Sequence, residues 1–381
     1  MESTCNELLE HCLRGETWTD DLLSRALAVE EGRAFLSIVI ERLGDLFEPR
    51  LCETYTSLFA AAVAKVCPEL TMRLRRAPPA NRAPDKVNRV YVLSRITLGA
   101  DVAVTSVLLD AAKQCYPTAE IVFVAPRKNY ELFEADPRIH HAPAPYARAG
   151  TLAERLRSSA DLWLEDGLVI DPDSRLTQLG LIAVCKEANY LLFESRSYGG
   201  NSLDRLSDLA ARWARDVLGA TNARPFVAPL ASAEPPAVIT VSLGVGENPA
   251  KRLAGDFERD LLRELARTGA SVLVDKGGSH EERCRVEKVL VPGMRTHDGA
   301  FARFAALIAR SRLFVGYDSA AGHVASACGV PQIAIMNGFA SERTLARWRP
   351  NGVVVRGDAV DPAGEVKRAL YRSMPIRSSG Q

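Results

Sequence analysis

The sequence lacks several features that would assign it to a membrane, secreted or nucleic-acid-binding class. It has no run of eighteen or more apolar residues, and it begins with Glu2 and Glu7 instead of a basic region and an apolar core, so we expect neither a membrane span nor a signal peptide. Its eight cysteines include no Cys-x-x-Cys pair, which indicates neither a zinc site nor a disulfide framework. A net charge of +1 does not favour nucleic acid. We expect a cytoplasmic protein with reduced thiols.

The first part of the chain is predicted to be helical. In residues 1–76, apolar residues recur at helical spacing, as in Leu22, Leu23, Ala26 and Leu27, and no strand pattern is present. Residues 77–86 contain three prolines and no periodicity, which is typical of a linker. We therefore predict a small helical bundle that is an autonomous unit, so that a chain starting near residue 81 would remain folded.

Beyond the linker, strands and helices alternate in two series. Residues 87–222 form the first series and residues 237–381 the second, which ends in a helix, and a proline-containing linker at 223–236 separates them. This alternation predicts two tandem Rossmann-like α/β domains with mostly parallel sheets. Such domains bind ligands at the carboxyl ends of their strands, so we expect a cleft between them.

The segment around Asp318 is the most informative motif. The apolar run 313–315 is typical of a buried strand, a turn of small residues follows, and Ala321, Ala325 and Cys328 then recur at helical spacing. The first turn of a helix presents unpaired backbone N–H groups and the positive end of the helix dipole. Because small side chains let a ligand approach the backbone closely, this turn is a suitable binding site for a diphosphate.

The same segment resembles the signature of glycosyltransferase family 9, the heptosyltransferase-like enzymes. Asp-Ser, a small residue, two further residues and His precede an Ala-rich helix and Gly-Val-Pro. The resemblance implies the GT-B arrangement of the two domains, and it implies that Asp318, Ser319, Ala320 and His323 line the site of a nucleotide-sugar donor. The usual Gly after Asp-Ser is Ala320 here.

A second part of the resemblance follows the first strand of the middle domain, where the chain reads Gly99-Ala100-Asp101. In family 9, a Gly-Asp pair at this point supplies the proposed general base, so the resemblance implies that Asp101 accepts a proton from the acceptor hydroxyl and places Gly99 on the acceptor side. One residue is inserted relative to the family pattern. The alternative is that Asp101 only caps a helix.

Further donor contacts are expected in the C-terminal domain. Gly244 and Gly246 lie in a loop that leads to Lys251, and in family 9 the matching lysine pairs with the donor diphosphate, which would neutralise the leaving group without a metal. An acid after the second strand can bind ribose, and the resemblance places this role on Glu281 or Glu282. The alternative is a capping box, because Ser279 lies three residues before Glu282.

The acceptor side is expected to include Asp171 and Arg175, which follow a strand as in the family; the alternative is a turn and helix cap at Asp-Pro-Asp. Together the motifs predict an inverting, metal-independent glycosyltransferase with no cofactor and no metal site. Its substrates would be a nucleotide sugar, with ADP-heptose implied by the family, and a glycan, lipid-linked or protein acceptor. We also expect peripheral contact with the inner face of the membrane and a protein partner at the helical bundle. An inactive GT-B-like scaffold protein and a nucleotide-sugar epimerase are the alternatives.

Overall fold

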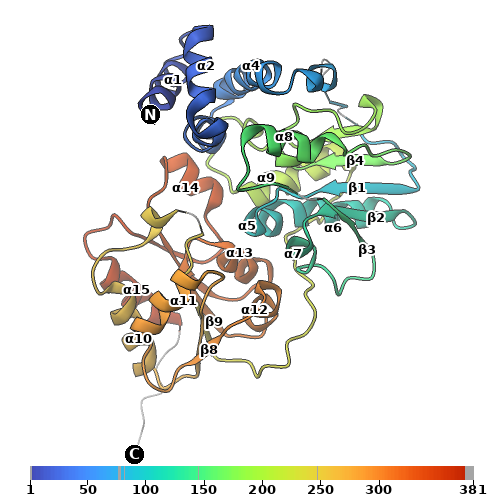
Figure 1. Ribbon diagram of the computed structural model, residues 1–381. Helices are drawn as coiled ribbons and strands as arrows, with labels where there is room; N and C mark the ends of the chain where they lie inside the picture. Colours follow the sequence, from blue (N-terminus) through green and yellow to red (C-terminus); the bar gives the residue numbers. More distant parts are fainter. Residues whose placement is uncertain (1, 76–78, 81, 145, 247, 374–381) are drawn as a thin grey trace, which may run out of the picture.

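The computed structural model describes residues 2–75, 79–80, 82–144, 146–246 and 248–373. Parts of the expected linker (residues 77, 78 and 81) and the C-terminal residues 374–381 lie outside the described residues. Figure 1 shows three parts: a helical bundle at the N-terminus, an α/β domain beside it, and a second α/β domain at the C-terminal end.

The N-terminal part is helical, as its periodicity predicts. The hydroxyl of Thr19 caps the second helix by accepting a hydrogen bond from the backbone of Leu22 at 3.2 Å. The helical elements are α1 (Glu2–Arg14), α2 (Asp20–Ala28), η1 (Val29–Gly32), η2 (Phe35–Ile40), α3 (Glu41–Asp45), α4 (Pro49–Val66) and η3 (Pro68–Arg73).

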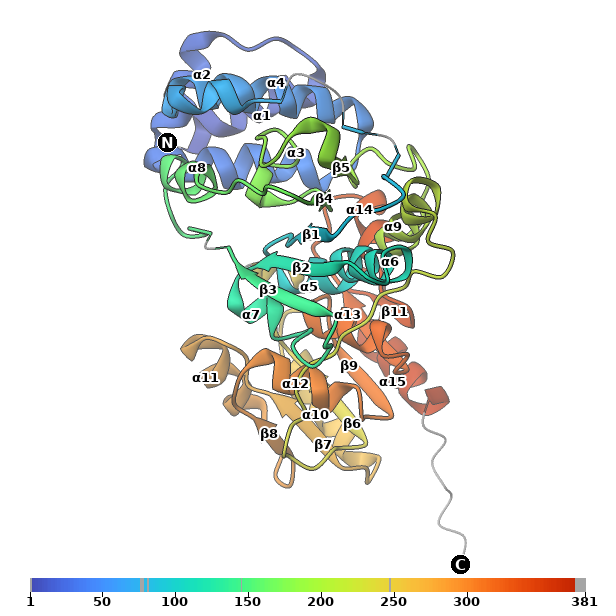
Figure 2. The same cartoon turned by 90° about the vertical axis from the view of Figure 1, so that its right-hand side faces the viewer.

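The bundle shares its hydrophobic core with the middle domain, which contradicts the expectation of an autonomous unit. The core includes Leu152 and Leu156 of α8 (Leu152–Ala160), together with residues 179, 181 and 182. At the far end, Arg73 donates hydrogen bonds to the carbonyl groups of Leu162 (2.8 Å) and Ala183 (2.6 Å). Figure 2 shows the bundle packed along α8. Removing the bundle would therefore expose a large apolar surface of the middle domain.

The middle domain is a five-stranded parallel sheet with strand order β3-β2-β1-β4-β5. Its apolar strand residues are buried between the flanking helices, as expected for a parallel sheet. The strands are β1 (Arg89–Leu93), β2 (Glu120–Ala125), β3 (Ile139–Pro143), β4 (Leu168–Asp171) and β5 (Tyr190–Leu192). The other helical elements are α5 (Leu98–Ala100), η4 (Asp101–Thr105), α6 (Ser106–Cys115), α7 (Arg127–Tyr130), η5 (Arg175–Thr177), η6 (Glu187–Asn189), α9 (Leu206–Trp213) and η7 (Ala214–Leu218).

The C-terminal domain is a six-stranded parallel sheet with strand order β11-β10-β9-β6-β7-β8. Its strands are β6 (Ile239–Ser242), β7 (Val272–Asp275), β8 (Arg295–His297), β9 (Leu313–Tyr317), β10 (Gln332–Met336) and β11 (Val353–Arg356). Its helical elements are η8 (Pro249–Lys251), α10 (Phe257–Arg267), α11 (His280–Val289), α12 (Phe301–Ile308), α13 (Ala320–Ala327), α14 (Glu342–Trp348) and α15 (Pro362–Ser373). Both sheets thus have the doubly wound order that the alternating pattern predicts, and the predicted fold class is confirmed.

The two α/β domains meet where α13 packs against α5 and η4. This contact depends on Gly99: a Cβ atom there would lie 3.2 Å from Cδ2 of His323 and 3.3 Å from Cα of Ala320. The absence of a side chain therefore lets α13 approach the middle domain closely.

Candidate active site

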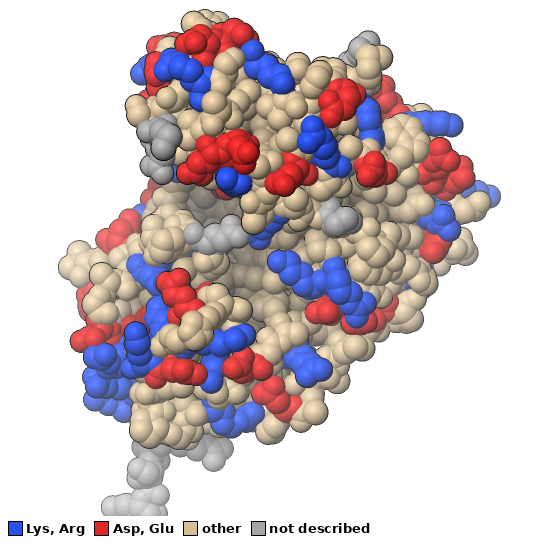
Figure 3. Space-filling view, viewed as in Figure 1, with Lys and Arg blue, Asp and Glu red and all other residues tan. Residues whose placement is uncertain are grey.

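A cleft of about 870 Å³ separates the two α/β domains, and all three parts of the chain line it. Figure 3 shows the hollow between the upper and lower parts of the molecule. The loops after β1, β4, β6, β7, β9 and β10 all contribute, as expected where the carboxyl ends of two parallel sheets face each other. A second hollow of about 630 Å³, lined by residues 82–85 and 215–219, lies away from these strand ends.

The amino end of α13 forms one wall of the cleft. Asp318, Ser319 and Ala320 line it directly after β9, so the predicted strand–turn–helix is present. Ser319 is the residue before the helix, and its hydroxyl oxygen is buried without a hydrogen-bond partner among the described residues. A buried hydroxyl and the free N–H groups of the first helical turn can together bind phosphate oxygens.

Lys251 lies beside this helix terminus. Its Nζ atom donates to Oδ2 of Asp318 at 2.6 Å, and the two side chains are 27% and 14% exposed. Asn337 fixes the loop by donating to the carbonyl of Ala250 at 2.8 Å. Gly244 and Gly246 also line the cleft, and Gly246 has a φ of 62°, which glycine adopts readily. The predicted donor loop and the Asp318 motif therefore meet on the same wall.

His323, one turn into α13, faces the cleft and contacts the ring of Trp348 edge-on, with centroids 5.8 Å apart. Burial lowers the pKa of the imidazole, and Lys251 adds to this effect, while Asp318 opposes it. A neutral imidazole at pH 7 can donate one hydrogen bond to a ligand without adding charge.

The acids after β7 divide into structural and cleft-facing groups. Glu281 is exposed and does not line the cleft. Glu282 does line it, but its carboxylate closes the capping box with Ser279 and also accepts from the backbone of Gly278 at 3.1 Å. Asp275, at the end of β7, faces the cleft, and burial raises its pKa to about 6. Asp275 therefore has the position suited to ribose, and Glu282 supports the loop beside it.

The structure contradicts the prediction that the Asp101 carboxylate faces the cleft. Asp101 is fully buried and does not line it. Four donors surround the carboxylate: the hydroxyls of Ser94 (2.6 Å) and Thr105 (2.7 Å), the backbone N–H of Arg95 (2.7 Å) and the side-chain amide of Asn129 (2.6 Å). With its oxygens occupied, Asp101 joins β1, η4 and α7 and has no access to an acceptor.

The inserted residue explains this orientation. Gly99 and Ala100 line the cleft, whereas the helix widens into a π-helical turn at Asp101–Thr105. A one-residue insertion in a helix is commonly absorbed as such a turn. Because successive helical residues are rotated by about 100°, the residue after Ala100 points to a different side, toward the sheet.

Of the two predicted acceptor residues, only Arg175 lines the cleft. Asp171 is buried, does not line the cleft, and accepts hydrogen bonds from Tyr190 (2.6 Å) and the backbone of Ser174 (2.6 Å). The structure thus contradicts an acceptor contact for Asp171 and confirms a turn-forming role. Arg175 does line the cleft, and its guanidinium makes no hydrogen bond or ion pair within the described part of the chain.

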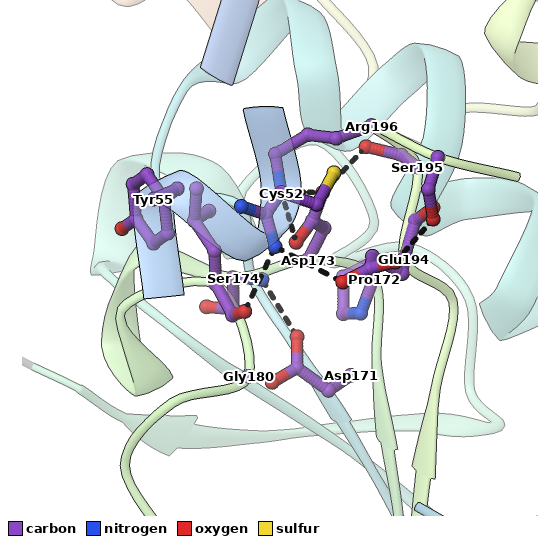
Figure 4. Close-up of polar contacts among 12 residues, drawn as sticks. Cys52, Tyr55, Asp171, Pro172, Asp173, Ser174, Gly180, Glu194, Ser195 and Arg196 are labelled. Atoms are coloured by element: carbon purple, nitrogen blue, oxygen red, sulfur yellow. Dashed lines mark hydrogen bonds and ion pairs between the residues drawn. The ribbon is translucent and has the colours of Figure 1, made fainter. Parts of the chain in front are cut away.

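A buried ion pair supports this wall. The Arg196 guanidinium lies 3.2 Å from Oδ2 of Asp173, and it stacks over the ring of Tyr55 on α4 at 4.6 Å. The hydroxyl of Ser195 donates to the same carboxylate at 2.8 Å. Figure 4 shows these groups between the loop after β4 and the bundle. The bundle is thereby fixed to the loop that carries Arg175.

Sequence reasoning missed the contribution of the bundle to the cleft. Glu41, Arg42 and Asp45 of α3 line it, as does Arg95 after β1. Arg95 lies within a recognisable strand-end motif, and it donates to the hydroxyl of Ser195 at 2.8 Å. By contrast, α3 has only the pattern of a short surface helix, so no local signal identifies its acids.

Among the described residues, no group of three His, Cys, Asp or Glu side chains could hold a metal ion. No helix of the described ranges is long and apolar enough to cross a bilayer.

Comparisons with known proteins agree with the fold. Residues 245–369 match the family model for glycosyltransferase family 9 (heptosyltransferase). The crystal structure of the glycosyl transferase family 9 protein from Veillonella parvula is similar, with a TM-score of 0.57 and 17% identity, over 77% of this chain and 99% of that one. No curated protein matches the sequence.

Two E. coli structures show the same likeness. ADP-heptose lps heptosyltransferase II has a TM-score of 0.54 and 17% identity, over 75% of this chain and 98% of that one. Heptosyltransferase WaaC with ADP-2-deoxy-2-fluoro heptose has a TM-score of 0.57 and 15% identity, over 74% and 99%. The fold is thus the GT-B arrangement of heptosyltransferases. With the family-model match across residues 245–369, the resemblance to glycosyltransferase family 9 is confirmed for the C-terminal domain.

Proposed function

We propose that the protein transfers a sugar, with heptose the first candidate, from a nucleotide diphosphate to an acceptor hydroxyl, with inversion and without a metal ion. The observation that carries this proposal is that Lys251, the amino end of α13 and the hydroxyl of Ser319, which has no partner among the described residues, lie on one wall of the cleft. These groups supply positive charge and hydrogen-bond donors where a leaving diphosphate would gain negative charge. The E. coli heptosyltransferase structure with an ADP-heptose analogue supports ADP-heptose as donor.

Inversion is supported by the separation of the two walls. The donor groups lie on the C-terminal domain, whereas Arg95 and Arg175 lie on the middle domain opposite. An acceptor bound on the middle-domain side would attack the anomeric carbon from the face opposite to the diphosphate. The new C–O bond then forms as the bond to the diphosphate breaks, and a single displacement inverts the anomeric configuration.

The acceptor would be bound with help from the helical bundle. Because α3 lines the cleft beside Arg175, the bundle forms part of the acceptor wall in this proposal. The mixed charges of this wall, Glu41 and Asp45 with Arg42, Arg95 and Arg175, suit a hydroxyl-rich acceptor that carries acidic groups, such as a glycan or a lipid-linked sugar.

A donor screen tests the proposal. Labelled ADP-, UDP- and GDP-sugars, including ADP-heptose, are incubated with the protein, with and without lipopolysaccharide core, and the products are separated by mass. We expect ADP release and a sugar–acceptor product from ADP-heptose, with the rate unchanged within about twofold by EDTA, because Lys251 and α13 supply the charge. A strict need for a divalent ion would contradict the metal-independent mechanism.

The inactive-scaffold alternative has one observation in its favour, since the residue at the family's base position does not reach the cleft. Tight ADP binding with no turnover of any nucleotide sugar would support that alternative. Conversion of the donor sugar to an epimer without ADP release would support the epimerase.

A further inference from the structure

Six acids line the cleft, and most are already engaged by protein groups. Asp173 is bound by Arg196 and Ser195, Asp318 by Lys251, and Glu282 by its capping box. Asp275 accepts from the backbone of Gly277 and lies at the ribose end of the C-terminal sheet. Glu41 lies 4.0 Å from Arg155. The Asp45 carboxylate, in contrast, accepts no hydrogen bond within the described part of the chain.

Asp45 lines the same cleft as Arg95 and Arg175 of the middle domain and Lys251 of the C-terminal domain. The charges that act on its carboxylate come, in order of strength, from Arg175 and Arg95 on the middle domain, then Lys251 on the C-terminal domain, then Arg42 on its own helix. A reacting hydroxyl must lie between the acceptor wall and the leaving group. The carboxylate of Asp45, within reach of charges from both walls, can therefore face such a hydroxyl.

The backbone around Asp45 is bound by α14 of the C-terminal domain. The hydroxyl of Thr344 on α14 donates to the carbonyl of Asp45 at 2.8 Å, and Arg343 donates to the carbonyl of Phe47 at 3.1 Å. The rings of Phe47 and Trp348 meet edge-on with centroids 6.2 Å apart. Asp45 thus sits on a segment anchored to the donor domain, while its own bundle is packed on the middle domain.

We propose that Asp45, supplied by the N-terminal bundle, is the general base of the transfer reaction, in the place that Asp101 cannot fill. The inference rests on the proposed function. The carboxylate accepts the proton of the acceptor hydroxyl as its oxygen forms a bond to the anomeric carbon. The bond from that carbon to the diphosphate breaks in the same step, and Lys251 and α13 neutralise the charge of the departing group.

The environment of Asp45 suits this task. Water reaches the side chain inside the cleft, yet protein surrounds it on most sides, and this loss of hydration raises its pKa, while the four cations oppose the rise. Glu41 and Arg42 face the cleft from the same helix, and Arg343 lies on α14 behind it. A base whose pKa is raised toward the working pH accepts a proton more effectively.

The test compares Asp45→Asn, Asp101→Asn and the exposed control Glu53→Gln on α4 in the full-length protein. ADP release from ADP-heptose is measured with water and with lipopolysaccharide core as acceptor, and ADP affinity by calorimetry. We expect Asp45→Asn to lower kcat by about 10²- to 10³-fold, with ADP affinity unchanged within about twofold. The thermal midpoint should stay unchanged, because the Asp45 carboxylate makes no hydrogen bond to any described residue. The fall in kcat of the native protein at low pH should disappear.

Asp101→Asn should instead lower the thermal midpoint and retain kcat in the folded fraction, and Glu53→Gln should behave as the native protein. A native kcat in Asp45→Asn, with intact ADP binding, would overturn the assignment of the base and leave the proposed function standing. Failure of the native protein to release ADP from any nucleotide sugar would refute the proposed function itself.

Discussion

The ion pair between Lys251 and Asp318 gives the sharpest test of the proposal that the cleft stabilises a leaving diphosphate. Both side chains are mostly shielded from water, at 27% and 14% exposure, so an effective dielectric constant of about 20 applies. At a separation of about 5 Å, the attraction between Lys251 and one phosphate charge is about 3 kcal/mol. This corresponds to about a 100-fold change in rate.

The change is Lys251→Met, which preserves the aliphatic part of the side chain. We expect kcat/KM for the donor to fall by about 10²- to 10³-fold. Two effects contribute: the cation is lost, and the carboxylate of Asp318, now unpaired, repels the diphosphate. ADP release and ADP affinity measure the loss, and Lys367→Met on the exposed surface of α15 serves as control.

A double variant tests the repulsion between Asp318 and the diphosphate. Adding Asp318→Asn to Lys251→Met removes the repulsion, so the double variant should recover about tenfold, which is about 1.4 kcal/mol of coupling. A double variant that is no faster than Lys251→Met would show that Asp318 has a role unrelated to charge balance. Native kcat/KM in Lys251→Met would show that the lysine does not act on the diphosphate.

Three further predictions concern the architecture. A chain starting at Val87 should aggregate, because it exposes the leucines of α8 that complete the bundle core; a monomeric fragment with native circular dichroism would contradict the shared core. Burial raises the pKa of Asp171 to about 6 from an ordinary 3.8. The contribution of Asp171 to the free energy of unfolding is therefore present below pH about 4 and is lost as the pH rises through about 6. The stability lost over this range is about 3 kcal/mol. The difference in unfolding free energy between the native protein and Asp171→Asn should follow that curve, and a difference independent of pH would refute it. Gly99→Ala should lower the thermal midpoint and ADP release together, at a cost of about 1 to 3 kcal/mol, because the methyl group meets the backbone of α13; an unchanged midpoint would contradict the close approach.

Local sequence patterns were sufficient for the fold and for the donor wall. Alternating apolar runs and helical periodicity predict two parallel sheets, since they record which faces are buried. The segment from Leu313 to Cys328 predicts its strand, turn and helix because each step depends on neighbours in the chain. Lys251 and Ser319 meet because both follow strands whose carboxyl ends share one edge of the sheet.

The direction of individual carboxylates, however, was decided only by tertiary structure. In Gly99-Ala100-Asp101, a single inserted residue is absorbed by a π-helical turn, which rotates Asp101 into the interior. Asp45 belongs to a helix whose sequence resembles any exposed surface helix, and it enters the cleft because the bundle docks on the middle domain and α14 binds its backbone. The sequence by itself therefore determined the elements and the strand–turn–helix around Asp318, which depend on short-range periodicity. Which acid faces the substrate depends on rotations of about 100° per residue and on contacts across some 300 positions of the chain, and only the folded structure sets these.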